Sequence, residues 1–167
     1  QAKHRNEVGD MGQELFSYDE QNGFQLIKDI NPGQNYSSSP DAFCIYNDKL
    51  YFAAEHKNYG RELWVYDGVN NPSIVYDIRN GTNSSSPTEL TVYNNKLYFS
   101  ANNGSSGAEL WVYDGVNNPS MVYNINSSSG DGSSPTYFAV YNNKLYFNAS
   151  NGSNSGNTGS ELWVYDG

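Results

Sequence analysis

The sequence predicts an all-β fold of β-propeller-type repeats, each made of four antiparallel strands, with essentially no helix. A seven-residue motif, ELWVYDG, occurs at residues 62–68, 109–115 and 161–167, and a related form, ELFSYDE, occurs at residues 14–20. Two shorter motifs repeat in step with it at intervals of about 50 residues, which is the length of a propeller blade. They are KLYF at 49–52, 96–99 and 144–147, and SSP at 38–40, 85–87 and 133–135. No segment keeps the apolar period of a helix for more than two turns.

The first half of each repeat predicts a hairpin, as the third copy illustrates. Pro87 follows a run of serines and precedes a strand over residues 89–93. Asn94 and Asn95 predict a tight turn, because asparagine tolerates the positive φ that hairpin turns require. A second strand follows over residues 96–100. Both strands are rich in β-branched and aromatic side chains, which suit a half-buried pleated surface.

The second half of the repeat predicts another pair of strands. The polar segment 102–107 is typical of a loop, and the strand at 109–113 ends at the turn signal Asp114-Gly115. A fourth strand follows at 120–125. Four short antiparallel strands joined by turns make a propeller blade. Both faces of the third strand should be buried, because each blade packs between two neighbours.

The repeats divide the chain into a single array: a partial blade at 1–36, blades at 37–83 and 84–130, and a partial blade at 131–167. This phase predicts thirteen strands, or about three and a quarter blades, whereas propellers close with roughly four to eight. Three arrangements stay open: a ring closed by several copies, a piece of a longer repeat protein, and an open stack. The expected protein partners are therefore flanking repeats of a longer chain or other copies of this one.

Composition excludes several classes of function. The formal net charge is −9, so we expect no nucleic-acid partner, because phosphate binding requires clustered lysine and arginine. No apolar run reaches the ~20 residues that span a bilayer, so we expect no membrane insertion. Cys44 is the single cysteine, which rules out a disulfide within the chain. Because it lies in an apolar-alternating strand, we expect a buried, unreactive thiol.

Several segments follow one longer pattern. They are G-R-E-L-W-V-Y-D-G at 60–68, V-Y-D-I-R-N-G at 75–81, S-S-S-P at 84–87, K-L-Y-F-S-A-N-N-G at 96–104 and F-Q-L-I-K-D-I-N-P-G at 24–33. Together they resemble the ELWxxDGT repeat of large secreted or surface proteins of bacteria, which is similar to kelch-type propeller blades. The resemblance covers essentially the whole chain. It implies an extracellular or cell-surface location and a role in adhesion more than a reaction.

The chain departs from the ELWxxDGT pattern at two places. Val69 and Val116 stand where the pattern has threonine after Asp-Gly, and Asn102-Asn103-Gly104 stands where Asp-Asp-Gly is common. The second change weakens the case for bound calcium. We therefore predict no cofactor, with calcium as the alternative.

One large aromatic side chain recurs in each third strand: Phe16, Trp64, Trp111 and Trp163. One aromatic per blade could form a set of sugar-stacking platforms, as in repeated lectin propellers. Each tryptophan nevertheless lies in mid-strand between packing residues, and large aromatics dominate buried surface. We therefore predict that these residues form the core between blades.

An aspartate precedes glycine at the end of the third strands. Calcium binding requires several carboxylate or carbonyl oxygens, whereas this position supplies one carboxylate per repeat with no second acid at fixed spacing. An aspartate in such a turn instead bonds its own backbone. We therefore predict structural turns and no metal site at Asp67, Asp114 and Asp166, and a turn-capping role for Asp29, Asp77 and Asn124.

A glutamate begins every third strand, as Glu14, Glu62, Glu109 and Glu161. We expect it to pair across strands with the lysine of KLYF, at 49, 96 or 144, with a contribution of about 0.2–1 kcal/mol. A catalytic pair of carboxylates requires one member in an unusual setting. Four equivalent settings argue against that role, so we predict no catalytic residues and no enzymatic activity.

The loop after the second strand varies between repeats, and loops on a rigid scaffold are where binding concentrates. Its polar side chains either hydrogen-bond to sugars or act as solvated spacers, and both interpretations stay open. The candidate ligand-binding residues are Glu55, His56, Asn58, Tyr59, Asn102, Asn103, Asn151 and Asn154.

Asn-x-Ser/Thr sequons are frequent, and a chain rich in these residues produces several by chance. In a glycosylating secretory host the loop sequons would carry glycans, whereas in a bacterial host they would have no such meaning. The candidate N-glycosylation sites are Asn35, Asn80, Asn83, Asn103, Asn126, Asn148 and Asn151.

Three hypotheses for function follow from these features. The first is a non-enzymatic extracellular repeat module for adhesion or scaffolding, with glycans as candidate ligands. The second is a structural building block of a surface layer, sheath or filament, whose strand edges pair between copies. The third is a fragment of a larger propeller enzyme, which would need unique catalytic residues converging at one face of a ring. The near-identical repeats offer none.

Overall fold

The computed structural model describes residues 12–33, 36–127, 130, 132–152 and 159–167. These residues form thirteen strands in four antiparallel sheets and no helix, which confirms the predicted fold class of propeller-type blades. No helix in this part of the chain is long and apolar enough to cross a membrane.

We number the sheets as blades one to four. Blade one contains β1 (Leu15–Asp19) and β2 (Gly23–Lys28). Blade two contains β3 (Asp41–Tyr46), β4 (Lys49–His56), β5 (Gly60–Tyr66) and β6 (Ser73–Tyr76). Blade three contains β7 (Thr88–Tyr93), β8 (Lys96–Asn102), β9 (Ala108–Tyr113) and β10 (Ser120–Tyr123), and blade four contains β11 (Thr136–Tyr141), β12 (Lys144–Ser150) and β13 (Ser160–Tyr165).

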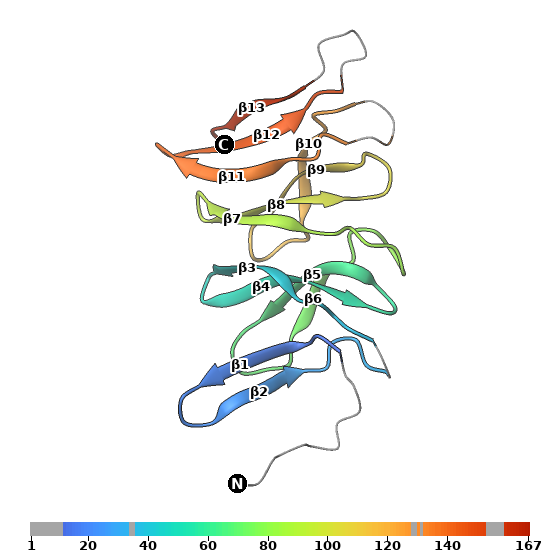
Figure 1. Cartoon of the computed structure of the whole chain (residues 1–167). Helices are drawn as coiled ribbons and strands as arrows, with labels where there is room; N and C mark the ends of the chain where they lie inside the picture. The colour runs from blue at the N-terminus through green and yellow to red at the C-terminus, as the bar shows by residue number, and fades with distance from the viewer. Residues whose placement is uncertain (1–11, 34–35, 128–129, 131, 153–158) are drawn as a thin grey trace.

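Each blade is an up-and-down meander, and the blades stack in chain order (Figure 1). The first strands of successive blades, β3, β7 and β11, are neighbours along one side of the stack. Blade one and blade four lie at its opposite ends (Figure 1). The repeat length observed in the sequence therefore corresponds to one sheet and one step of the stack.

The tight turns between the first and second strands form as predicted. Asn94 and Asn95 have φ angles of 47° and 55°, so both central residues adopt the left-handed conformation of a hairpin turn. A bulge interrupts the same hairpin, where the register shifts between Thr88 and Thr91. Glu89 in that bulge also has a positive φ, of 60°. Blades two and four repeat both features.

The core consists of apolar clusters between successive blades. Between blades two and three, Leu63, Leu97 and Phe99 are fully buried. Trp64 and Trp111 are 7% and 8% exposed and belong to successive clusters. The prediction that the tryptophans form the core between blades is confirmed for these two.

The same interfaces account for two other expectations. Cys44 packs at the edge of the cluster between blades two and three, and burial raises the pKa of its thiol. It is half-buried rather than fully buried. Phe16 is 49% exposed, because no blade covers that face of β1 in the described part of the chain.

Two tyrosines link the first strand of one blade to the next blade by hydrogen bonds. Tyr46 donates its hydroxyl hydrogen to the carbonyl of Asn95, and Tyr93 donates to the carbonyl of Asn143, both at 3.0 Å. Each bond joins the end of one blade's first strand to the tight turn of the next. Because Tyr46 and Tyr93 are 3% exposed, these bonds satisfy hydroxyl groups that would otherwise be buried without partners.

The repeated glutamates do not pair with the lysines of KLYF, so the expected cross-strand ion pair is wrong. The register places Glu62 opposite Ala54 and Glu109 opposite Ala101. Lysine lies at the other end of the second strand, where Lys144 is 3.7 Å from Asp166. A cross-strand pair requires directly opposed residues, which these are not.

Glu109 instead holds blade four against blade three. Its carboxylate accepts hydrogen bonds from the Ser133 hydroxyl at 2.6 Å and the Ser133 amide at 2.9 Å. The amide of Ile125, just beyond β10, donates to the same carboxylate at 3.1 Å. The carbonyl of Ser133 in turn accepts from the amide of Ser150, at the end of β12. One carboxylate thus connects three segments from two blades.

We call this arrangement the glutamate latch, and it recurs between all successive blades. Glu14 accepts from Ser38 and the Ile30 amide, and Glu62 accepts from Ser85 and the Ile78 amide. The serine is always the first of the SSP motif. In all three latches, both the glutamate and the serine are buried.

Burial makes these hydrogen bonds necessary. A buried carboxylate without donors is strongly unfavourable, whereas donors aimed at its oxygens offset the lost hydration. No lysine or arginine neutralises the three latch glutamates in the described residues. Removal from water raises the pKa of Glu62, although the hydrogen bonds from Ser85 and Ile78 oppose that shift.

The latch predicts different effects for the same substitution at two equivalent positions. Glu109→Ala should destabilise the chain by about 3 kcal/mol, because several buried donors lose their acceptor together. Glu161→Ala should change stability by less than about 0.5 kcal/mol, because Glu161 is exposed. Urea unfolding followed by circular dichroism measures both. Equal effects of the two substitutions would contradict the latch.

Candidate functional site

A polar pocket of about 380 Å³ lies where blades two, three and four meet. Its wall is formed mainly by hydroxyl groups, with one guanidinium and one carboxamide. The lining residues are Arg79, Ser84, Ser85, Ser86, Thr88, Ser100, Asn102, Ala108, Ser134, Pro135 and Thr136. Arg79 is the one charged member of this set.

The segments around the SSP motifs position most of these groups. Ser84, Ser86 and Thr88 surround the motif that leads into β7, and Ser134 and Thr136 surround the motif that leads into β11. The glutamate latches fix both of these segments, because Ser85 and Ser133 are their donors. The pocket is therefore built on a rigid part of the fold.

A single residue explains why the pocket is open. Ala108 lies immediately before the latch glutamate of β9, where β5 has Arg61. In blade two the Arg61 guanidinium donates to the carbonyls of Ser39 and Ala53 and forms an ion pair with Asp41. It therefore occupies the space that is vacant beside Ala108. Repeats with the same backbone thus differ in whether this space is open.

The predicted loop of blade two forms an aromatic hairpin beside the pocket. The Tyr59 ring stacks on the His56 ring with their centroids 4.9 Å apart. The centroids of the His56 and Trp64 rings are 5.9 Å apart. Burial and the neighbouring Lys57 lower the pKa of His56. Its Nδ1 accepts a hydrogen bond from the amide of Asn58. Tyr59 is 37% exposed, so one aromatic ring is accessible at this edge.

The hairpin is held close to the pocket rim. The amide of Arg61 donates to the Ser84 hydroxyl at 2.9 Å. A Cβ added to Gly60 would come within 2.5 Å of the Asn83 carbonyl oxygen, so only glycine permits this approach. Glu55, His56, Asn58 and Tyr59 themselves are absent from the pocket lining.

The structure places the other candidate ligand-binding residues differently. Asn102 lines the pocket and accepts from the Gly104 amide. Asn103 Oδ1 accepts from the amides of Ser105 and Ser106, which shapes its own loop. Asn151 is exposed beyond β12. Asn154 lies outside the described residues.

The sequons also differ in their accessibility. Asn80, Asn83 and Asn151 are exposed, and Asn103 and Asn148 are half-buried. Asn126 is 3% exposed, and its side-chain amide donates to the Gly132 carbonyl at 2.9 Å. A glycan at Asn126 is therefore incompatible with this fold. Asn35 lies outside the described residues.

The Asp-Gly turns are bonded to their own backbone. Asp114 Oδ1 accepts from the amides of Val116 and Asn117, and Oδ2 accepts from the Asn117 side chain. Asp67 makes the same bonds, which confirms the prediction of structural turns for these two residues. Asp77 caps a turn through the Gly81 amide, as predicted. The described residues contain no group of three or more His, Cys, Asp or Glu side chains suited to a metal.

Sequence reasoning did not identify the pocket itself. About half of its lining residues lie in the SSP motifs or immediately after them, which the sequence marks as a repeat boundary and not as a surface, and of the predicted candidates only Asn102 is among the lining residues. The available signal was the difference between Arg61 and Ala108 at equivalent positions. That signal becomes informative only when the side chain of Arg61 is seen to fill the corresponding space.

Comparisons with known proteins found a distant similarity to a solved structure. No protein-family model matches the chain, and no curated protein matches it. Among solved structures, the chain is similar to an alpha-L-arabinofuranosidase from Clostridium thermocellum. The sequence identity is 16% and the TM-score is 0.36, over 82% of this chain and 71% of that one.

The Asp-Gly turns predict a measurable titration. Hydrogen bonds from the Asn117 side chain and then from the backbone hold the pKa of Asp114 at about 2, below the ordinary 3.8. The turn therefore favours the folded state above pH 3.8, and this contribution is lost as the pH falls through about 2. Asn117→Ala should raise the pKa of Asp114 toward 3.8, as measured by carboxyl-carbon NMR. The adjacent exposed Asn118→Ala is the control, and an unchanged pKa in Asn117→Ala would contradict the assignment.

Proposed function

We propose that this chain is a non-enzymatic extracellular repeat module for adhesion or scaffolding, and that it binds saccharides in the polar pocket between blades two, three and four. The observation that carries the proposal is the pocket wall of hydroxyl, carboxamide and guanidinium groups on rigid strand ends. A volume of about 380 Å³ lies within the range of roughly 300–1,000 Å³ found for small-molecule sites.

The chemistry of the wall favours a ligand rich in hydroxyl groups. Serine and threonine hydroxyls both donate and accept, and Asn102 adds an amide that does the same. Arg79 supplies donors only and carries a positive charge, which suits the carboxylate of an acidic sugar. The exposed face of Tyr59, close to the rim, offers a surface on which a further sugar ring could stack.

The same wall supports binding over catalysis. Glycoside hydrolysis generally uses two carboxyl groups placed on either side of the scissile bond. No aspartate or glutamate lines this pocket. The latch glutamates nearby have their carboxylates occupied by structural hydrogen bonds.

A second candidate function is the structural building block, and the two ends of the stack favour it. At the blade-one end, Phe24 and Tyr18 are 78% and 63% exposed. At the blade-four end, Leu162 is 77% exposed. Large apolar side chains gathered at an accessible end are typical of interaction surfaces. Association of one end with the other would build an open filament.

Saccharide binding can be tested by filling the pocket. Ala108→Arg, which copies the residue of blade two, should weaken binding at least about tenfold, because the new side chain occupies the ligand space. Isothermal titration calorimetry with neutral and uronate-containing oligosaccharides measures the affinity. Ser120→Arg adds the same charge at an exposed site outside the pocket and is the control. Equal affinities for both variants, or no binding by the unmodified chain, would contradict the proposal.

Self-association can be tested by light scattering over a range of concentrations. The structural hypothesis predicts masses above the 18.6 kDa of one chain. Phe24→Asp should return the mass to that of a monomer, because it places a charge in the apolar end surface. Val69→Asp changes an equally exposed residue in a turn of blade two and is the control. A constant monomer mass in the unmodified chain would eliminate this candidate.

A further inference from the structure

The polar pocket has an equivalent one repeat earlier, and there a side chain of the protein itself fills it. The Arg61 guanidinium donates to the carbonyls of Ser39 and Ala53, at 3.0 and 3.4 Å. It also forms an ion pair with Asp41. Arg61 therefore shows which groups of the wall can hold a ligand. The same positions of the next repeat, all of which line the open pocket, hold Ser86, Ser100 and Thr88.

The backbone around the filled and the open space has the same geometry. Ser39 and Ser86 both adopt a left-handed conformation, with φ angles of 42° and 49°. The first two strands of blades two and three also pair in the same register, with a bulge at the same place. The carbonyl groups of Ser86 and Ser100 therefore face the open space as their equivalents face Arg61. They are acceptors for the donors of a bound ligand.

Two exchanges of charge distinguish the open space from the filled one. The neutral Thr88 stands where blade two has Asp41, the ion-pair partner of Arg61. Arg79 stands where the preceding repeat has Asn31, directly after the isoleucine whose amide bonds to the latch glutamate. A cationic ligand would therefore meet a like charge and no acid in the wall. An anionic ligand would meet the opposite charge.

The position of Arg79 carries a structural asparagine at two other interfaces. Asn31 donates to the carbonyl of Ser37 at 3.2 Å and accepts from the amide of Lys57 at 2.9 Å. Asn126 likewise donates to the carbonyl before its latch serine, at 2.9 Å. A neutral carboxamide thus satisfies the structural requirement of this position, and the fold does not need a charge there.

The guanidinium of Arg79 has donors that the fold does not use. One nitrogen donates to the carbonyl of Ser84 at 3.5 Å, which is long for a hydrogen bond. The loop amide of Gly104 bonds instead to Asn102, at 2.7 Å. Arg79 forms no ion pair with the described residues. Its side chain lies against Gly104, where an added Cβ would come within 2.9 Å of Arg79 Nε.

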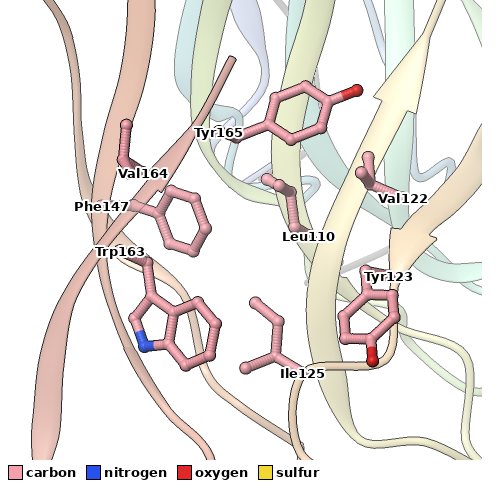
Figure 2. Close-up of a pocket in the computed structure, with 8 residues that line it drawn as sticks. All are labelled: Leu110, Val122, Tyr123, Ile125, Phe147, Trp163, Val164 and Tyr165. Atoms are coloured by element: carbon pink, nitrogen blue, oxygen red, sulfur yellow. The ribbon is translucent and has the colours of Figure 1, made fainter. Parts of the chain in front are cut away.

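A second cavity, of about 310 Å³, lies between blades three and four and has a different character (Figure 2). Its walls are aliphatic and aromatic, and no charged residue belongs to them. A ligand that is both anionic and rich in hydroxyl groups is therefore matched by the polar pocket and not by this cavity. The lining residues of the cavity are Leu110, Val122, Tyr123, Ile125, Phe147, Trp163, Val164 and Tyr165.

We propose that the polar pocket selects acidic saccharides, and that Arg79 determines this specificity. The carboxylate of a uronic acid unit accepts hydrogen bonds from the Arg79 guanidinium. Hydroxyl groups of the same sugar donate to the carbonyls of Ser86 and Ser100, where the donors of Arg61 lie one repeat earlier. This inference rests on the proposed saccharide binding, and it adds the charge of the ligand and its orientation in the pocket.

Two ligands that differ only in charge test the selectivity. Isothermal titration calorimetry compares trigalacturonate with its methyl ester, in which the carboxylates are neutralised. A salt concentration of about 0.15 M screens the other charges of the protein beyond ~8 Å. The unmodified chain should bind the acid at least about tenfold more tightly than the ester, because charge-assisted hydrogen bonds are stronger than neutral ones.

Arg79→Asn tests the residue, and the asparagines at the equivalent positions 31 and 126 indicate that the fold accepts it. This variant should bind the acid at least about tenfold more weakly and leave the affinity for the ester nearly unchanged. Arg79→Lys should recover part of the preference, because it keeps the charge but not the planar fork. Lys28→Asn removes the same charge from an exposed position on β2 and is the control. Circular dichroism and the melting temperature show that each variant is folded.

The possible results separate this inference from the proposed function. Equal binding of acid and ester, binding of the ester alone, or equal weakening of both probes by Arg79→Asn would leave saccharide binding in place and overturn the role of Arg79. The same loss of acid binding in Lys28→Asn would assign the preference to net charge and also overturn it. No binding of either probe at millimolar concentration would overturn both proposals.

Discussion

The buried carboxylate of the latch is the interaction on which the rest of the stack depends. Apolar clusters hold successive blades together, but apolar contacts alone do not specify how one sheet sits on the next. The latch supplies that specification, because Glu109 accepts from Ser133 of the next blade and from the Ile125 amide of its own. A sheet shifted by one residue would leave the charge without donors, at a cost of several kcal/mol. The shared geometry of the three interfaces follows from that penalty.

A stack fixed in this way can vary elsewhere without losing its geometry. The latch serines hold the start of every first strand, so the neighbouring hydroxyl groups keep their positions whatever the loops contain. The residue before the latch glutamate then decides whether the space beside them is filled, as by Arg61, or open, as beside Ala108. An open pocket thus arises because one side chain is small on a backbone that its neighbours hold rigid.

The sequence predicted the features that depend on local chemistry. Strands, their number, the Asn94-Asn95 turn and the self-bonded Asp67 and Asp114 follow from residues a few positions apart. The partner of Glu62 could not be predicted in that way, because Ser85 lies in the next blade and is brought close only by the stacking of sheets. The polar pocket escaped prediction for the same reason, since it combines residues of three blades. The repeated SSP motif indicated a boundary between repeats. Its role as a hydrogen-bond donor to the latch glutamate depends on contacts between blades, which the sequence alone does not show.

The same reasoning explains what the fourth strand adds to blades two and three. It contributes three things together: hydrogen bonds to the third strand, an aliphatic side chain between blades, and, just beyond the strand, an amide for the latch glutamate. The apolar contact and the latch are therefore coupled through one short segment of chain. A change that displaces this segment would remove the apolar contact and also leave a buried carboxylate with one donor fewer, so its cost should exceed that of the apolar contact alone.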